Sequence, residues 1–298
     1  MTHVQSDRPS STARLIARCT LLAASDARLR PLVPAGAIAP LETLLTEIGG
    51  GSWFEFARRH TWTRALLLAG ERFVLPGIIA HYLARKRWLE ARASAALAAG
   101  FEQVVILGAG FDTLGYRLHS AHPTVRFFEL DHPATQRPKA AALTVAPNLA
   151  FLPADLAHAL PSSILLADSR FDPYRRTFVV AEGLLMYFPE TRVREILADL
   201  TRLPATQVAF TFMAPGADGR AAFRGGSPAI GAWLRFRREP FAWALEPARL
   251  AAFLRPLGFD LLAVAGAPEL RAKVLAPAGL ATIPLAEGEH LCLAAPAP

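Results

Sequence analysis

Two glycines and an acid, Gly108, Gly110 and Asp112, have the types and spacing of a ligand-binding turn. They follow an apolar, β-branched run (101–107) and precede a segment with helical spacing (114–118). Glycine adopts positive φ readily and lets a ligand lie against the main chain. Asp112 or Thr113 can cap the helix that follows, whose first N–H groups then face the ligand. Glycines at such a corner can also serve packing alone, so the turn by itself leaves both interpretations open.

A second acid, Asp131, ends the strand-like run 126–131. It lies about 20 residues past the glycines, the separation at which a carboxylate reaches a ribose diol in a strand–helix–strand unit. The alternative interpretation is a helix N-cap before Pro133. Together the turn and Asp131 predict a ligand that contains a nucleoside.

The turn differs from the dinucleotide fingerprint, which requires a third glycine three residues after the second. Thr113 occupies that position. Asp112 lies where a pyrophosphate would bind, and a carboxylate there would repel it. S-adenosylmethionine (SAM) carries no phosphate, but it does carry an ammonium and a sulfonium, which an acid tolerates. The charges therefore favour SAM over NAD.

The composition is that of a folded protein with a basic excess. Of 298 residues, 52% are hydrophobic and 19% are charged, which supports a core and argues against disorder. The net charge is +7, but the basic residues are scattered, whereas nucleic-acid-binding proteins carry a basic stripe with interleaved aromatics. We expect no nucleic-acid partner. The charge indicates mild attraction for anionic substrates, or compositional drift only.

The two cysteines, Cys19 and Cys292, have neither a metal-ligand spacing nor a disulfide framework, which fits a reducing compartment. The sequence shows no signal-peptide pattern, and no apolar run has the length of a membrane span. We therefore expect a cytoplasmic protein without a membrane partner.

The first 75 residues are predicted to form a helical cap on the substrate side. Three segments have helical spacing: 11–30, 41–48 and 53–70. Four of their large side chains are expected in the core: Trp53, Phe56, Trp62 and Leu66. A long helix from Pro76 to about Ala99, ended by Gly100, then opens the SAM-binding domain, 76–298.

From residue 104 onward, strand-like and helix-like segments alternate. Seven strands are predicted, at 104–107, 126–130, 151–156, 178–181, 207–212, 259–264 and 291–294. This order is typical of a Rossmann-like α/β fold, with a mostly parallel seven-stranded sheet and helices on both faces. Ligands bind beyond the carboxyl ends of such strands, where Gly108, Asp131, Asp155 and Glu182 all fall.

Residues 213–243 do not fit this alternation, because they are rich in glycine, proline and aromatics. We predict a partly helical insertion at the ligand edge of the sheet, where a lid is a natural role. The alternative is a surface excursion without a role.

The motifs of 76–212 resemble the leucine carboxyl methyltransferase-like family of class I SAM-dependent methyltransferases, which includes bacterial polyketide O-methyltransferases. The motifs are, in order, 82–85, 104–113 with 117–118, 128–133 with Lys139, 155–156 and 181–187. The family often has Arg where this chain has Leu114 and Ala157. The rest of the chain matches only loosely.

The resemblance implies a SAM site made of Arg85, Gly108, Ala109, Gly110, Asp112, Asp131, Asp155, Leu156 and Glu182. Arg85 would bind the SAM carboxylate, Asp131 the ribose and Glu182 the methionine ammonium. The pair 155–156 would border the adenine, and Tyr187 would lie near the methyl group or the substrate.

Arg85 has a second interpretation from the residues alone. With Lys86 and Arg87 it forms a basic run that fits a solvated helix face. In the functional interpretation, its guanidinium pairs a ligand carboxylate in a two-pronged geometry.

The expected reaction is methyl transfer to an oxygen of a small-molecule acceptor. A carboxylate acceptor needs no base, and an arginine would hold it, whereas a phenol or alcohol needs a base within hydrogen-bond reach. His81 and His132 are the candidate bases, and either can instead be a structural histidine. Because no zinc or magnesium spacing is present, a metal-free transfer is expected.

Three other functions stay open. The first is an NAD-dependent enzyme on the same sheet, which Asp112 and Thr113 disfavour. The second is methylation of RNA or of a protein carboxylate, and the third is SAM binding without catalysis.

Overall fold

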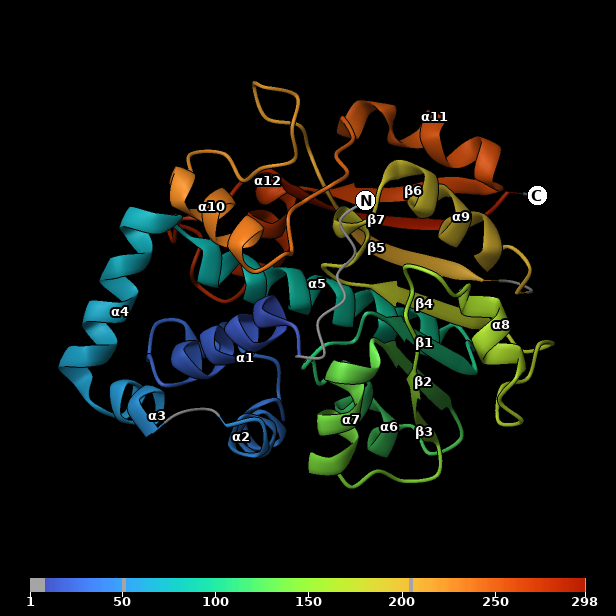
Figure 1. Cartoon of the computed structure of the whole chain (residues 1–298), viewed down its shortest axis with the longest axis horizontal. Helices are drawn as coiled ribbons and strands as arrows, with labels where there is room; N and C mark the ends of the chain where they lie inside the picture. Colours follow the sequence, from blue (N-terminus) through green and yellow to red (C-terminus); the bar gives the residue numbers. More distant parts are fainter. Residues whose placement is uncertain (1–8, 50–51, 204–205, 298) are drawn as a thin grey trace.

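A seven-stranded sheet lies at the centre of the computed structural model, which describes residues 9–49, 52–203 and 206–297 (Figure 1). The strands are β1 Gln103–Leu107, β2 Arg126–Asp131, β3 Leu149–Pro153, β4 Thr177–Ala181, β5 Gln207–Met213, β6 Phe259–Ala265 and β7 Glu289–Pro296. Their order is β3-β2-β1-β4-β5-β7-β6. Strands β1 to β5 run parallel, and β7 pairs antiparallel with both β5 and β6. The predicted mostly parallel seven-stranded sheet is confirmed.

Helices cover both faces of the sheet, because successive residues of a strand point to opposite sides. Val104 and Ile106 of β1 pack in a core with α1 (Ser11–Ala24), α2 (Ile38–Glu47) and α5 (Ile78–Ala98). Val105 and Leu107 pack in a second core with α8 (Pro161–Leu166), α9 (Glu190–Leu200) and α11 (Leu250–Leu254). All five residues of β1 are therefore buried, as expected for a central parallel strand covered on both sides.

Four further helices complete the sheet domain: α6 Leu114–Ala121, α7 Pro133–Ala142, α10 Pro228–Phe236 and α12 Ala267–Leu270. The sequence pattern did not predict α8 or α12. They have 6 and 4 residues, too few to show a helical period.

Helix α5 runs across the first core and begins and ends close to where the sequence predicts. Gly77 precedes it with φ of +79°, and a Cβ at this position would lie 2.4 Å from the backbone carbonyl of Pro284. Gly100 follows it with φ of +82° and donates its N–H to the Leu97 carbonyl. The glycines thus fix both ends of the helix that carries Arg85.

The expectation for residues 53–70 is wrong in two respects. The segment forms two helices, α3 (Ser52–Arg59) and α4 (Thr61–Val74), instead of one. The four side chains expected in the core are exposed: Trp53 by 66%, Phe56 by 46%, Trp62 by 67% and Leu66 by 66%. Helix α4 lies at the edge of the molecule, and Thr63 is its one buried residue (Figure 1). Periodicity indicates an apolar helix face but does not show whether another element covers it.

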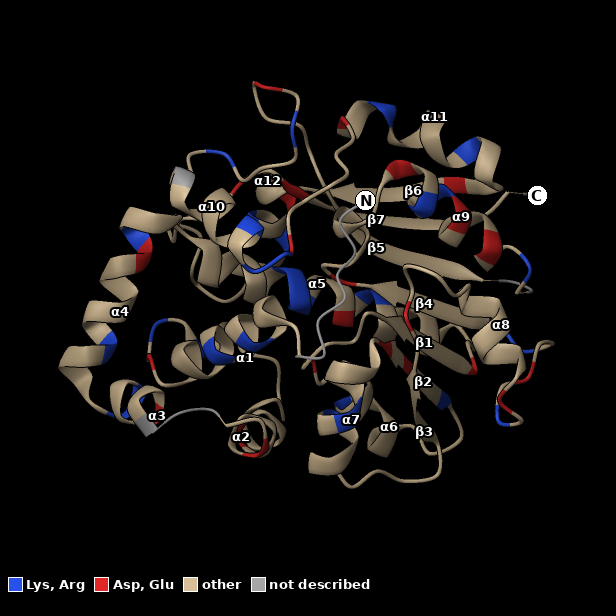
Figure 2. Cartoon of the chain, in the orientation of Figure 1, with Lys and Arg blue, Asp and Glu red and all other residues tan. Residues whose placement is uncertain are grey.

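Charged residues are spread over the helices and loops in the view of Figure 2, without a continuous basic stripe. In the described part of the chain, a membrane-spanning length and apolarity are found in no single helix. The pair α4 and α5 reaches both only when joined, and these helices meet at a 90° bend.

Two glycine substitutions are expected to have opposite effects on stability. A Cβ on Gly115 in α6 would lie 2.6 Å from Oε1 of the buried Glu129, so Gly115→Ala should lower the free energy of unfolding by about 1–3 kcal/mol. Gly70 in α4 has no atom within 4 Å of its Cβ position, so Gly70→Ala should raise it by up to about 1 kcal/mol. Urea unfolding of both variants measures the difference, and a stabilised Gly115→Ala protein would contradict the packing described here.

Candidate functional site

The glycine turn follows β1 and is fixed by hydrogen bonds from its own backbone. Gly108 and Gly110 have φ of +63° and +50°. Gly108 donates its N–H to the Leu130 carbonyl at 2.7 Å, and Gly110 donates its N–H to Asp131. A Cβ on Gly108 would lie 2.6 Å from the Leu184 side chain. The turn therefore requires glycine both for its conformation and for the close approach of the segment after β4.

Asp112 lies one residue before Thr113, the N-cap residue of α6, and its carboxylate accepts the N–H of Leu114, the first residue of that helix, at 2.6 Å. The same carboxylate pairs with Lys86 of α5. Burial alone would raise the pKa of Asp112, but the charges of Lys86, Arg117 and Lys139 and the bond from Lys86 together outweigh burial and hold this pKa below its ordinary range. The acid of the turn is thus ionised and paired, whereas the sequence argument treated it as a free charge.

Lys139 of α7 is a buried lysine that bonds to the backbone of the glycine turn. Its ammonium lies 2.5 Å from the Glu129 carboxylate and donates to the Asp112 carbonyl. Both Lys139 and Glu129 are almost completely buried. Burial raises the pKa of Glu129 to about 7, although Lys139 opposes this shift.

Asp131 lies at the carboxyl end of β2, next to the turn. Its carboxylate accepts the N–H groups of Gly110 and His132, the latter at 2.5 Å. Burial raises the pKa of Asp131, and the two backbone donors oppose this shift. At the end of β3, Asp155 is more open, with 35% of its side chain exposed, and it pairs with His158 at 2.7 Å.

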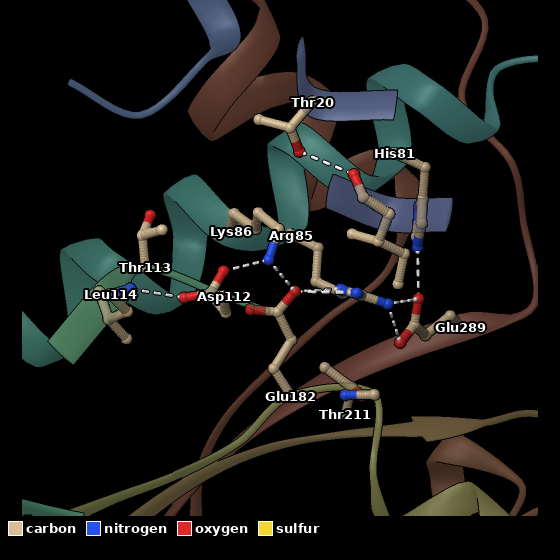
Figure 3. Close-up of polar contacts among 12 residues, drawn as sticks. Thr20, His81, Arg85, Lys86, Asp112, Thr113, Leu114, Glu182, Thr211 and Glu289 are labelled. Atoms are coloured by element: carbon tan, nitrogen blue, oxygen red, sulfur yellow. Dashed lines mark hydrogen bonds and ion pairs between the residues drawn. The ribbon is translucent and has the colours of Figure 1, made fainter. Parts of the chain in front are cut away.

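Glu182, at the end of β4, joins two cations of α5 (Figure 3). Its carboxylate lies 2.8 Å from Arg85 and 3.0 Å from Lys86. Arg85 also pairs with Glu289 at 2.9 Å, and Glu289 lies 2.8 Å from the His81 ring. A continuous chain of alternating charges therefore runs from the interior of the protein to the glycine turn.

A cavity of about 660 Å³ opens over the carboxyl ends of β1 to β4. It is lined by every residue of the predicted SAM site: Arg85, Gly108, Ala109, Gly110, Asp112, Asp131, Asp155, Leu156 and Glu182. Tyr187 and His132 also line it. Because the carboxyl ends of parallel strands meet at one edge of a sheet, acids far apart in sequence come together here.

The two candidate bases do not have the geometry of a base. His81 is fully buried, faces Glu289 and is not among the residues that line the cavity. His132 lines the cavity, but its Nδ1 accepts the N–H of Ala134 and so caps α7. The expectation of a catalytic His81 therefore has no support in the geometry, because folding places Glu289 between this ring and the cavity edge at Arg85.

The sequence did not predict that residues from α1 and from the insertion would meet over the cavity. Glu239 accepts the backbone N–H groups of Ser11 and Thr12 at 3.0 and 3.1 Å. Glu239 and Thr12 line the cavity, and Phe241 packs against Tyr187 with ring centroids 5.4 Å apart. The insertion is partly helical, as expected, through α10. Its movement as a lid stays a prediction.

Lys86 is the other functional candidate that sequence reasoning missed, since it was assigned to a solvated face with Arg87. The signal that could have found it is its helical position next to Arg85. Arg87 is exposed, as that interpretation predicts. Within the described ranges, no group of three or more His, Cys, Asp or Glu side chains could hold a metal ion.

The sheet order and the cavity at its carboxyl edge define the fold of the class I SAM-dependent methyltransferases. The family model for leucine carboxyl methyltransferases matches residues 32–201, and the chain belongs to this family. That match covers more than half of the chain and includes β1 to β4.

The curated relatives have names that refer to S-adenosyl-L-methionine-dependent methyltransferases. A protein of Mycolicibacterium smegmatis that bears the name "Putative S-adenosyl-L-methionine-dependent methyltransferase" is 34% identical over 165 residues, 51% of each chain. One of Mycobacterium avium is 38% identical over 148 residues, 46% of this chain and 47% of that protein. The chain thus spans about half the length of the curated relatives it matches. The solved mitomycin 7-O-methyltransferase is 15% identical, with 93% of this chain and 74% of that chain covered and a TM-score of 0.46.

Proposed function

We propose that this protein is a SAM-dependent methyltransferase that acts on an oxygen of a small-molecule acceptor. The observation that carries the proposal is the cavity, which gathers the glycine turn and the acids of three strand ends, Asp131, Asp155 and Glu182, in one place. The family membership and the names of the relatives support SAM as the cofactor.

The residues present fit SAM. A Cβ on Gly110 would lie 3.1 Å from the Ala13 Cβ and 4.0 Å from the Asp131 carboxylate, so a side chain there would take space beside Asp131 in the cavity. Asp131 would hold the ribose diol, and residues 155–156 would border the adenine. Glu182, which lies within hydrogen-bond distance of two cations, would accept the methionine ammonium.

When bound, SAM supplies an electrophilic methyl group and its own leaving group. The protein then has to align the acceptor and exclude water. Tyr187 and Glu239 line the part of the cavity formed by the segment after β4, α1 and the insertion, and we assign this part to the acceptor. Burial, followed by the charge of Glu239, raises the pKa of Tyr187, so its hydroxyl stays neutral and can donate to an acceptor oxygen.

Calorimetric titration with SAM, S-adenosylhomocysteine and NAD tests the proposal. We expect binding of the first two and none of NAD. Labelled methyl transfer from SAM to a panel of phenols and carboxylic acids then identifies the acceptor class, and mass analysis of the product shows whether an ether or an ester forms. A protein that binds NAD and ignores SAM would contradict the proposal.

A further inference from the structure

An apolar stripe runs along α4, the helix at the edge of the molecule (Figure 1). With 3.6 residues per turn, four residues lie within about 60° of one another around the helix axis: Trp62, Leu66, Ala69 and Phe73. The exposed fractions are 67% for Trp62, 66% for Leu66 and 86% for Phe73, and Ala69 is exposed too. No residue in the described part of the chain covers this surface, which we call the α4 stripe.

Helix α3 packs against α4 and adds Trp53 and Phe56 to the exposed apolar surface of this edge. Because an aromatic side chain presents about 150–250 Å² when fully exposed, these two and the three large residues of the stripe expose on the order of 650 Å². The largest apolar patch of a typical monomer measures about 300–600 Å², whereas each partner of a standard interface contributes about 800 Å². The apolar surface therefore has the size that a stable protein interface requires.

The arginines near the stripe are mostly bonded within the chain. Arg58 pairs with Glu42 and Glu55, at 2.6 and 2.7 Å. Arg64 donates to the Arg58 carbonyl at 3.2 Å, which leaves Arg72 as the one exposed arginine of α4. A helix that docks on an anionic membrane carries a polar face rich in Lys and Arg for the lipid headgroups. The charges therefore favour a protein partner over a lipid surface.

The α4 stripe complements itself when two copies of the helix pack antiparallel. Its aromatic residues stand at its ends, and two alanines, Ala65 and Ala69, lie near its middle. A two-fold axis at the middle of the stripe places Trp62 opposite the partner's Phe73 and Leu66 opposite the partner's Ala69. Each contact then occurs twice, once on each side of the axis, as a closed two-fold interface requires. Large side chains that face small ones interdigitate, so the helices can approach closely.

We propose that two copies of this protein form a dimer by packing their α4 stripes antiparallel. The burial of aromatic side chains, which dominate the energetics of interfaces, drives the association. Interfaces of standard size reach micromolar affinity or tighter, so we expect a dissociation constant of about 10 µM or lower. Residues of α3 and α4 do not line the cavity over the strand ends, so the proposal does not depend on the proposed function.

Sedimentation velocity over a concentration range of about 1–100 µM tests the proposal, and the wild-type protein should sediment as a dimer. Leu66→Arg places two unpaired charges in the middle of the interface and should weaken dimerisation at least 100-fold, which leaves a monomer. Leu166→Arg is the matched control, because Leu166 is 53% exposed at the end of α8, on the opposite side of the molecule in Figure 1. This control should remain a dimer.

A complementary pair of variants tests the antiparallel register. Leu66→Glu and Ala69→Arg should each be monomeric alone, because the new charge faces an apolar residue of the partner. In an equimolar mixture, the new carboxylate of one variant lies opposite the new guanidinium of the other, and the second contact of the two-fold pair stays native. The mixture should therefore form a heterodimer.

Three results would overturn the proposal. The first is a wild-type protein that is monomeric over the whole range. If that monomer cosediments with vesicles of phosphatidylcholine and phosphatidylglycerol, the apolar surface docks on a lipid bilayer instead. The second is a dimer that persists in Leu66→Arg, since the interface would then lie elsewhere. The third is a mixture of the complementary variants that stays monomeric. Should Leu66→Arg not fold by circular dichroism, Phe73→Arg, at the most exposed position of the stripe, is measured in its place, and a persistent dimer is again the overturning result.

Discussion

Replacing Asp131 with asparagine is expected to weaken SAM binding by about 100-fold. The carboxylate accepts two backbone N–H groups, and its remaining lone pairs are available for the ribose hydroxyls. Asparagine keeps one acceptor oxygen without the charge. Hydrogen bonds to a charged group contribute about 1.5–3 kcal/mol each, so the loss of one and the weakening of the other lower the affinity by a factor on the order of 100. Asparagine also places an NH₂ donor where the carboxylate accepts N–H groups, which disturbs the turn at Gly110.

Asp155→Asn is the matched control for this substitution. Asp155 lies at the end of the neighbouring strand, is more exposed and pairs with His158 on the surface, so its variant should lose less than tenfold. Calorimetric titration of both variants with S-adenosylhomocysteine measures the contrast. A folded Asp131→Asn protein with near-normal affinity would show that β2 does not carry the ribose site.

Replacing Glu289 with glutamine should lower the free energy of unfolding by about 3–5 kcal/mol, because it leaves the buried Arg85 charge partly unpaired. Glu289 is completely buried and bonded to both Arg85 and His81. Burial alone would raise its pKa, but the charge of Arg85 and the bond from His81 outweigh burial and lower the pKa to about 2. Urea unfolding at neutral pH measures the loss.

The sign of the pH dependence follows from that lowered pKa. A carboxyl group whose pKa is lower in the folded state stabilises the fold above its unfolded pKa, about 4.3. That stabilisation is lost as the pH falls toward 2. The difference in unfolding free energy between wild type and Glu289→Gln should therefore be constant near neutral pH and shrink below about pH 4. Glu287→Gln, an equivalent change at an exposed position of the same segment, should show neither effect. A difference that grows on acidification would contradict the pairing with Arg85.

The two predictions rest on different kinds of feature. The position of Asp131 at a strand end could be predicted from the sequence, whereas the pairing of Glu289 with Arg85 could not. The strand ends were predictable, because a parallel sheet brings Gly108, Asp131, Asp155 and Glu182 to one edge whatever the loops between them do. The neighbours of these groups were not predictable. His81 was a candidate base because of its residue type, and its true partner, Glu289, lies 208 residues away in the chain.

The apolar surface of α3 and α4 shows the same limit of prediction from sequence. Trp53, Phe56, Trp62 and Leu66 have the spacing of a buried helix face, yet all four are exposed. Spacing depends on the helix alone, whereas burial depends on a second element, and helix α4 lies at the edge of the molecule with little packed against it (Figure 1). An apolar pattern therefore predicts a helix more reliably than it predicts a core.

By itself, the sequence determined the alternation of strands and helices, the glycine turn and the set of acids that end the strands. These features are local, because they follow from backbone preferences and from the period of the apolar residues. Tertiary structure alone decided which charges pair. Arg85 and Lys86 are adjacent in one helix, and only the positions of the acids around that helix decide that Arg85 pairs with Glu289 and Glu182 whereas Lys86 pairs with Asp112 and Glu182. Pairing is decided by distances of about 3 Å between segments far apart in the chain, and no local pattern encodes such distances.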